Sequence, residues 1–151
     1  GDPAFALRTA PLLAYYDVGP DRALFLGNAL WNQDQLLNEP SLQGGVFAIR
    51  PSQFDAKFNA SWQAIWQQTP GELSRLGFDA LALVAALSAT GDGQTLTPAG
   101  QWAQKLVTNK GFQGYSGAFR LLPDGSNVRA YEVRQIRNGQ SKIIQPAPDK
   151  I

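Results

Sequence analysis

The stretch from Gly111 to Ile144 most constrains the fold, because it contains two turn sequences with specific backbone requirements. In Pro123-Asp124-Gly125, proline presets φ for the first turn position and glycine accepts a positive φ. In Asn138-Gly139, both residues tolerate the left-handed region, as a type I′ turn requires. Residues 128–136, between the turns, alternate loosely between apolar and charged side chains, as in a strand with one wetted face. The stretch therefore predicts two β-hairpins.

Two apolar runs upstream predict buried parallel strands. Ala23 to Leu26 is followed by Gly27, and Gly44 to Ile49 is followed closely by Pro51. Short, continuously apolar runs of this kind are typical of strands covered on both faces. With the helices described next, they predict an α/β fold: a three-layer arrangement with a mostly parallel sheet, flanking helices and C-terminal β-hairpins.

Helical spacing and helix-start signals predict helices over residues 4–16, 52–68, 73–89 and a short segment opened by Thr97-Pro98. Asp2 is a suitable N-cap for the first, and Pro11 is expected to kink that helix or start a new turn. The aromatic stripe of helix 52–68 predicts core packing, with a partner groove as the alternative. Helix 73–89 is apolar nearly all round, which predicts burial between a sheet and other helices.

The sequence contains no histidine and no cysteine, which excludes most hydrolytic designs. Ser-His-Asp triads, cysteine nucleophiles and ordinary zinc sites all need one of these residues. Ser116 lies in a Gly-Tyr-Ser-Gly string, but Ala118 stands where a nucleophile elbow needs glycine. Enzymes that use only carboxylates, lysine or tyrosine stay possible from composition. Our prediction is that the chain is not an enzyme and holds no cofactor or metal.

The order of segments resembles the type 1 periplasmic binding proteins, the Leu/Ile/Val-receptor superfamily of ABC transporter substrate-binding proteins. The resemblance rests on the segments LLAYYDVGPDRALFLGNALWNQ, KFNASWQAIWQQTPGE and RLGFDALALVAALS, and on the final GFQGYSGAFR run with its two turns. Within the superfamily, it is nearest to the penicillin-binding-protein-activator branch. It implies that residues 1–151 form a single unit, the C-terminal part of a two-lobed fold. Such a part is either a truncated chain or one that pairs its exposed sheet edges in a homodimer.

The resemblance also implies where ligand contacts lie, in a cleft between two lobes. The loop after the first strand offers the amide of Asn28 and the ring of Trp31, and the predicted helix over residues 73–89 brings Arg75 and Phe78. The alternative for the loop is structural, with Asn28 capping a helix and Trp31 covering a core edge. No acidic residue occurs in that loop before Asp34, and Phe78 stands where family members commonly carry tyrosine.

By this resemblance, the function is non-catalytic binding of a small polar solute or amino acid for an ABC permease, in the periplasm. The full-length protein of such a family can be lipid-anchored in the cell envelope. The alternative function is a ligand-free regulator of a peptidoglycan synthase that acts by protein contact. The acidic residue missing from the loop and the missing tyrosine hydroxyl favour this alternative.

The basic residues of the chain are in excess towards its C-terminus. The chain has a net charge of +1, but from Lys105 onward eight basic residues stand against three acidic ones. This basic segment either docks an acidic partner or anionic surface, or is the solvated face of edge strands. Nucleic acid is not an expected partner, because aromatic residues do not interleave with the basic ones. No apolar run approaches the roughly 20 residues that span a bilayer.

Overall fold

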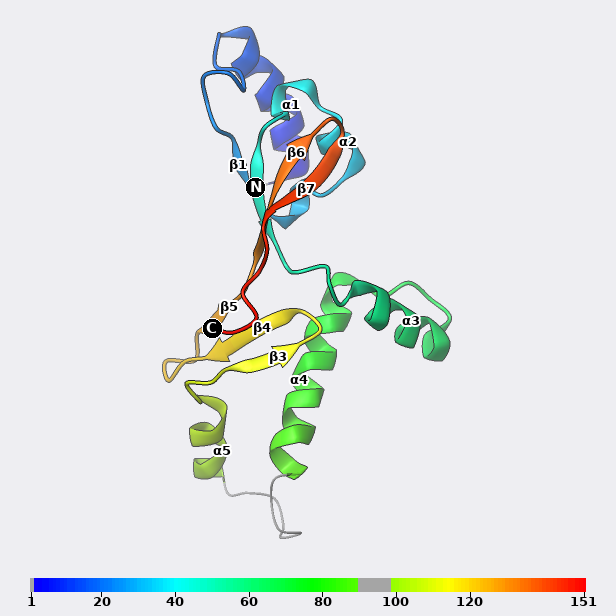
Figure 1. Ribbon diagram of the computed structural model, residues 1–151, viewed down its shortest axis with the longest axis vertical. Coiled ribbons are helices and arrows are strands. Elements are labelled where there is room, and N and C mark those ends of the chain that lie inside the picture. The colour runs from blue at the N-terminus through cyan, green and yellow to red at the C-terminus, as the bar shows by residue number, and fades with distance from the viewer. Residues whose placement is uncertain (1, 90–98) are drawn as a thin grey trace. The chain divides into compact units, whose positions relative to one another are not determined.

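A computed structural model describes residues 2–89 and 99–151 (Figure 1). The chain divides into two compact units. Unit 1 comprises Gly1–Arg50 and Tyr131–Ala147, and unit 2 comprises Pro51–Ala130 and Pro148–Ile151. That residues 1–151 form a single unit, the C-terminal part of a two-lobed fold, stays a prediction.

Unit 1 is a mixed four-stranded sheet with short helices. Its sheet has the order β1-β2-β6-β7, in which β1 and β2 are parallel and the other two pairings are antiparallel. Its elements are α1 (Pro3–Tyr15), β1 (Leu26–Gly27), the 3-10 helix η1 (Ala29–Trp31), α2 (Asp34–Leu37), the 3-10 helix η2 (Pro40–Leu42), β2 (Val46–Ile49), β6 (Glu132–Arg137) and β7 (Gln140–Gln145).

The core of unit 1 forms where α1, α2 and the 3-10 helices meet the sheet. It contains Ala10, Trp31, Leu36, Leu37, Leu42, Phe47 and Ile136. Asp2 caps α1 as predicted, since its carboxylate accepts the N–H of Ala4 at 3.0 Å. The helix continues through Pro11 to Tyr15, so of the two expected effects of Pro11 a new start does not occur, and a kink stays a prediction.

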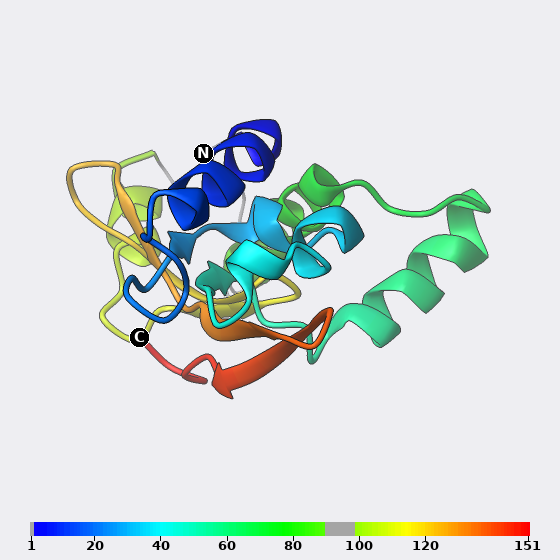
Figure 2. The same cartoon turned by 90° about the horizontal axis from the view of Figure 1, so that it is seen from above.

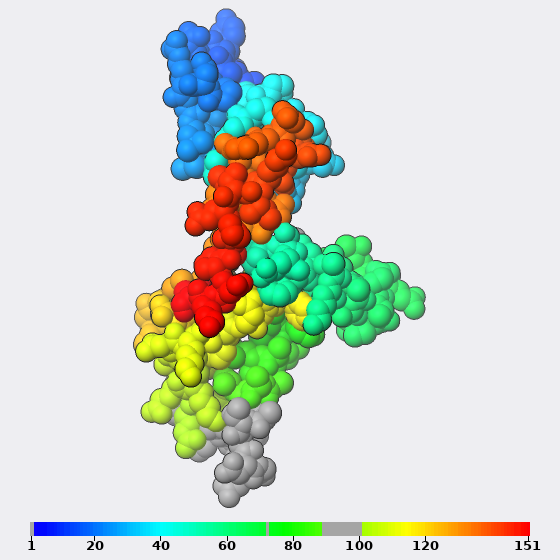
Figure 3. All heavy atoms as spheres, viewed as in Figure 1, coloured from blue at the N-terminus to red at the C-terminus, as the bar shows by residue number. Residues whose placement is uncertain are grey.

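The turn between β6 and β7 confirms the predicted type I′ hairpin (Figure 2). Asn138 and Gly139 both have positive φ, at 53° and 74°. Strand β7 forms one edge of the sheet, and its atoms are uncovered on the face shown in Figure 3.

Unit 2 combines helices with a separate antiparallel sheet of the order β3-β4-β5. Its elements are α3 (Asp55–Trp66), α4 (Glu72–Ala89), α5 (Ala99–Leu106), β3 (Phe112–Gly114), β4 (Gly117–Leu121) and β5 (Asn127–Arg129). The predicted turn between β4 and β5 is confirmed: Gly125 has φ of 84° and donates its N–H to the carbonyl of Leu122 at 3.0 Å. None of the helices in residues 2–89 and 99–151 could span a bilayer.

The predicted α/β fold with flanking helices and C-terminal hairpins is confirmed, but the prediction of a mostly parallel sheet is wrong. In the described ranges the only parallel pairing is that of β1 with β2. Residues 128–136 are not one strand, because β5 ends at Arg129 in unit 2 and β6 starts at Glu132 in unit 1. Tight hairpin turns join antiparallel strands only, and the chain's hairpins supply most of its strand pairs.

Helix burial also differs from the sequence-based prediction. On α4, Leu73, Leu81 and Val84 are exposed, whereas the polar residues Arg75 and Asp79 are buried. On α3, Phe58 is buried but Ile65 and Trp66 are exposed. An apolar sequence indicates that a helix is suited to burial. It does not show that other residues of this chain pack against the helix. The predicted Thr97-Pro98 helix start lies outside the described residues.

Candidate functional site

The candidate site is a hollow in unit 2 of about 290 Å³, which we call the aromatic hollow. Helix α3, helix α4 and the hairpin of β3 and β4 supply its walls. Figure 1 labels these elements on the ribbon. The volume lies near the lower end of the range of small-molecule pockets, about 300–1,000 Å³. The lining residues are Phe54, Lys57, Phe78, Asp79, Ala82, Gln113, Gly114 and Tyr115.

Aromatic rings in mutual contact form the apolar part of the hollow. The Tyr115 ring lies 5.2 Å from that of Phe78 and 6.5 Å from that of Phe54, in edge-to-face geometry. Behind them Phe58, 2% exposed, lies 5.2 Å from Tyr115 and 5.8 Å from Phe78. Edge-to-face pairs at these distances are favourable beyond the area they bury. The cluster therefore holds the rings of the hollow in defined positions.

Asp79 fixes the hairpin against α4. Its side chain is 4% exposed, and it accepts the backbone N–H of Tyr115 at 2.7 Å and that of Ser116 at 2.9 Å. It also accepts a short hydrogen bond from the hydroxyl of Ser116, whose oxygen accepts from Arg129 at 3.0 Å. Buried carboxylates are stable when hydrogen bonds satisfy them, as here. Ser116 is thus engaged in a structural network.

Lys57 is the cation among the residues that line the hollow. Its side chain is exposed on α3, and it makes no hydrogen bond or ion pair with any part of the chain that the structure describes. The opposite charge in the lining, Asp79, already accepts three hydrogen bonds. The hollow therefore presents aromatic surface beside an unpaired ammonium group.

Of the predicted site residues in unit 2, Phe78 lines the hollow and Arg75 lies behind it. Arg75 is 4% exposed and donates to the side-chain oxygen of Asn59 at 2.6 Å. Its guanidinium also pairs with Asp55 at 3.5 Å and stacks 4.9 Å from the Phe58 ring centre. These contacts join α3 to α4, so Arg75 supports the aromatic cluster from within the unit. Whether either residue touches a ligand stays a prediction.

The two predicted residues of unit 1 lie together beside α1. Asn28 caps η1, since its side-chain oxygen accepts the N–H of Leu30 at 3.1 Å. Trp31 is 7% exposed and belongs to the core. Its ring lies against Gly27, where a Cβ atom would be 2.1 Å from it. These contacts agree with the alternative in which Asn28 caps a helix and Trp31 covers an edge of the core. Both residues also line a hollow of about 250 Å³ next to α1, and their ligand role stays a prediction.

Sequence reasoning missed Lys57 and Tyr115. The signal for Lys57 is its position on α3, one residue before Phe58 and three after Phe54. Residues three apart on a helix share a face, so Lys57 and Phe54 lie on one side. Tyr115 follows Gly114, and a Cβ on that glycine would lie 2.4 Å from the Asp79 carboxylate. That close approach of turn and helix is invisible in the sequence. In residues 2–89 and 99–151, no cluster of side chains suits a metal ion.

Comparison with other sequences identifies no match: no protein-family model and no curated protein sequence is significantly similar to the chain.

Comparison with solved structures identifies the fold. The chain has the type 1 periplasmic-binding-protein fold, as the resemblance implied. A protein described as a branched-chain amino acid ABC transporter from Rhodospirillum rubrum matches 90% of this chain at 18% identity, with a TM-score of 0.67. The leucine binding protein LivK of Thermotoga maritima matches 97% at 19% identity and a TM-score of 0.55. LivJ from Streptococcus pneumoniae, a branched-chain amino acid transporter substrate binding protein in complex with isoleucine, matches 93% at 17% identity and 0.51.

The chain spans about two fifths of the length of these structures, 41% of the first and 42% of the other two. At these identities the likeness establishes the fold. The ligand and the partners of this chain have to be inferred from its own residues.

Proposed function

We propose that the chain is part of a non-catalytic, extracytoplasmic solute-binding protein of the ABC transporter receptor type. The observation that carries the proposal is the aromatic hollow of unit 2, which joins ordered rings to one unpaired charge in a fold whose similar structures include a leucine binding protein. Pockets of this make-up, mostly apolar with few polar groups, suit small solutes. The periplasm is the proposed compartment, and a permease of the same transporter is the proposed partner.

Solute binding without catalysis agrees with the residues that this chain has. The sequence lacks histidine and cysteine, and Ser116 is 5% exposed and bonded to Asp79 and Arg129. A serine nucleophile needs a general base beside it. The carboxylate beside Ser116 instead accepts two backbone N–H groups, which hold it in a structural role.

Native mass spectrometry followed by thermal-shift measurements tests the proposal. Freshly purified protein should carry a small-molecule adduct that is lost on mild activation, or be stabilised by members of a panel of amino acids, organic acids and sugars. A ligand at 100 times its Kd stabilises the folded state by about 2.7 kcal/mol, which a thermal shift detects readily. A clean apo mass together with no shift from any solute in the panel contradicts the proposal.

A second function is favoured by the exposed apolar face of α4, formed by Leu73, Leu81 and Val84. Contact with another protein is one of the roles that exposed apolar patches serve. We propose as the alternative a regulator that contacts a peptidoglycan synthase, as the penicillin-binding-protein-activator branch implies. Biolayer interferometry against a purified bifunctional synthase tests it, with Leu81→Ser expected to weaken the contact. Absence of binding at micromolar synthase concentrations contradicts it.

A further inference from the structure

The charges around the aromatic hollow indicate which class of solute fits it. We propose that the hollow binds a small monocarboxylate with a flat apolar body, and that the ammonium group of Lys57 pairs with the carboxylate. This inference rests on the proposed solute-binding function and assigns the ligand class to that same site. It rests on three observations. Aromatic rings form the walls of the hollow, Asp79 is hydrogen-bonded within the protein, and Lys57 makes no hydrogen bond or ion pair with the described residues.

The ring walls favour a flat apolar body. Phe54 and Phe78 both meet Tyr115 edge to face, with interplanar angles of 89° and 71°. Rings at steep angles to one another form a corner. A flat ligand in that corner can stack on one ring and meet another edge to face. The cavity volume of about 290 Å³ suits a ligand of one ring or a short branched chain.

The hydrogen bonds of Asp79 disfavour a cationic ligand. One carboxylate oxygen accepts the N–H of Tyr115, and the other accepts both the N–H and the hydroxyl of Ser116. The three donors are neutral, so Asp79 keeps its negative charge, but both of its oxygens are held on the turn. A ligand ammonium group could use only the acceptor capacity that these three bonds leave over.

Lys57 favours an anionic ligand. It lines the hollow without a hydrogen bond or ion pair to the described residues, so a ligand carboxylate displaces only water from it. Hydrogen bonds between two charged groups are stronger than those between neutral ones. A carboxylate at the mouth of the hollow would meet the ammonium group while its body lies among the rings.

Three probes that share a phenyl ring and differ in charge test the assignment. Phenylacetate, phenylacetamide and 2-phenylethylammonium are titrated into the protein by calorimetry or ligand-observed NMR. We expect phenylacetate to bind about tenfold more tightly than the amide, the change in affinity that one charge-assisted hydrogen bond gives. The amine should bind most weakly. Added salt should weaken phenylacetate binding and leave the amide unaffected.

Variants assign the effect to Lys57. Lys57→Gln should weaken phenylacetate binding about tenfold and leave phenylacetamide unchanged, because only the charged contact is removed. Lys57→Arg keeps the charge and should retain the preference for the acid. Lys142→Gln is the matched control, since Lys142 is an exposed lysine in the other unit and should change nothing.

The failures of the two proposals are distinguishable. Equal affinity for phenylacetate and its amide, or unchanged acid binding in Lys57→Gln, overturns the carboxylate assignment. Stabilisation by other solutes with no binding of the three probes also overturns it, and in both cases solute binding itself stands. If no probe binds, native mass spectra are clean and no solute shifts the melting temperature, both proposals fall.

Discussion

The buried carboxylate of Asp79 accepts the backbone N–H of Ser116 at 2.9 Å and so ties helix α4 to the turn between β3 and β4 (Figure 1). The turn follows the helix closely, because Gly114 has no Cβ where the carboxylate lies. This contact places Tyr115, whose ring forms a wall of the aromatic hollow, against Phe78. One helix carboxylate therefore determines the geometry of the candidate site.

Asp79→Ala should strongly destabilise the protein. The change leaves the backbone N–H groups of Tyr115 and Ser116 without their acceptor, and hydrogen bonds to a charged group contribute about 1.5–3 kcal/mol each. We expect a loss of about 3 kcal/mol in the free energy of unfolding, measured by urea denaturation. Asp21→Ala, at an exposed position, is the control and should change stability by less than about 0.5 kcal/mol. Equal losses for the two variants would refute the structural role of Asp79.

Substitutions of Gly114 and Gly77 by alanine test two different effects on stability: the close approach of the β3–β4 turn to α4, and the helix propensity of α4. At Gly114 an added Cβ would lie 2.4 Å from the Asp79 carboxylate, so Gly114→Ala should destabilise the protein by about 1–3 kcal/mol. Gly77 lies within α4 and has nothing within 4 Å of an added Cβ. Gly77→Ala should therefore stabilise by up to about 1 kcal/mol. Thermal unfolding of both variants checks this, and a stabilised Gly114→Ala would show that the turn does not approach α4 closely.

The turns were predictable from the sequence, but the strand pairing was not. The Asn138-Gly139 turn and the positive φ of Gly125 follow from what those residues tolerate locally. The pairing of β2 with β6 joins residues that are more than eighty positions apart, and nothing within Gly44 to Ile49 indicates its direction. An apolar run indicates burial of a strand and leaves its partner open.

The site was predictable only in part, for a similar reason. Phe78 was selected from a family resemblance, and it lines the hollow. Lys57 and Tyr115 become neighbours of Phe78 only because α3, α4 and a hairpin turn converge. Arg75 and Asp79 could not be predicted as buried, since charged residues are mostly exposed and are buried only where partners satisfy them.

Trp31→Ala should show that Trp31 is part of the core of unit 1. The side chain is 7% exposed and packs with Leu42 and Phe47, so its removal leaves a cavity. Truncation of a buried tryptophan costs about 3–5 kcal/mol in unfolding free energy. Trp66→Ala is the matched control, since Trp66 is exposed on α3, and should cost about 1 kcal/mol or less. Similar costs in urea titrations of the two variants would contradict the burial of Trp31.

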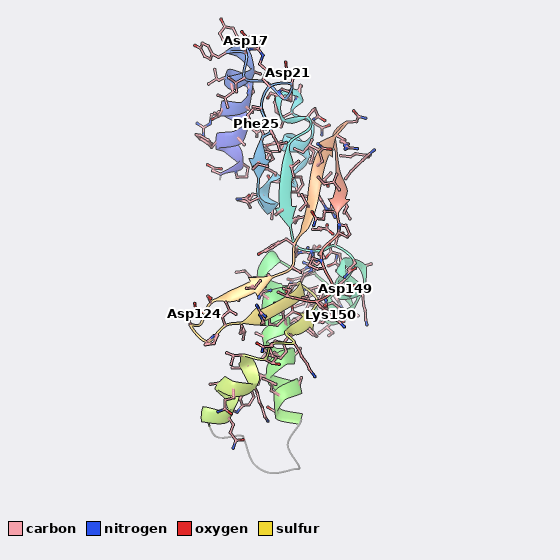
Figure 4. The ribbon with its side chains drawn as sticks, turned by 60° about the vertical axis from the view of Figure 1, so that its left-hand side comes forward. Asp17, Asp21, Phe25, Asp124, Asp149 and Lys150 are labelled. Atoms are coloured by element: carbon pink, nitrogen blue, oxygen red, sulfur yellow. The ribbon has the colours of Figure 1, made fainter. Side chains whose placement is uncertain are left out.

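Ser126 should control the titration of Asp124 in the turn between β4 and β5 (Figure 4). The Ser126 hydroxyl donates to the carboxylate at 2.6 Å and the Ser126 N–H at 2.9 Å. The hydroxyl bond, followed by the N–H bond, lowers the pKa of Asp124 below its ordinary value. A carboxyl with a lowered folded-state pKa stabilises the fold above its unfolded-state pKa, and this contribution is lost as the pH falls through the folded-state value.

Ser126→Ala removes the larger cause, so the pKa of Asp124 should rise towards its ordinary value. The acid-dependent part of stability that comes from this turn should shrink accordingly. Carbon-detected NMR titration of the Asp124 carboxyl between about pH 2 and pH 6 measures the midpoint in both proteins. Ser61→Ala, on the exposed side of α3, is the control and should leave the midpoint unchanged. An unchanged midpoint in Ser126→Ala would show that the hydroxyl bond does not set the titration of this carboxylate.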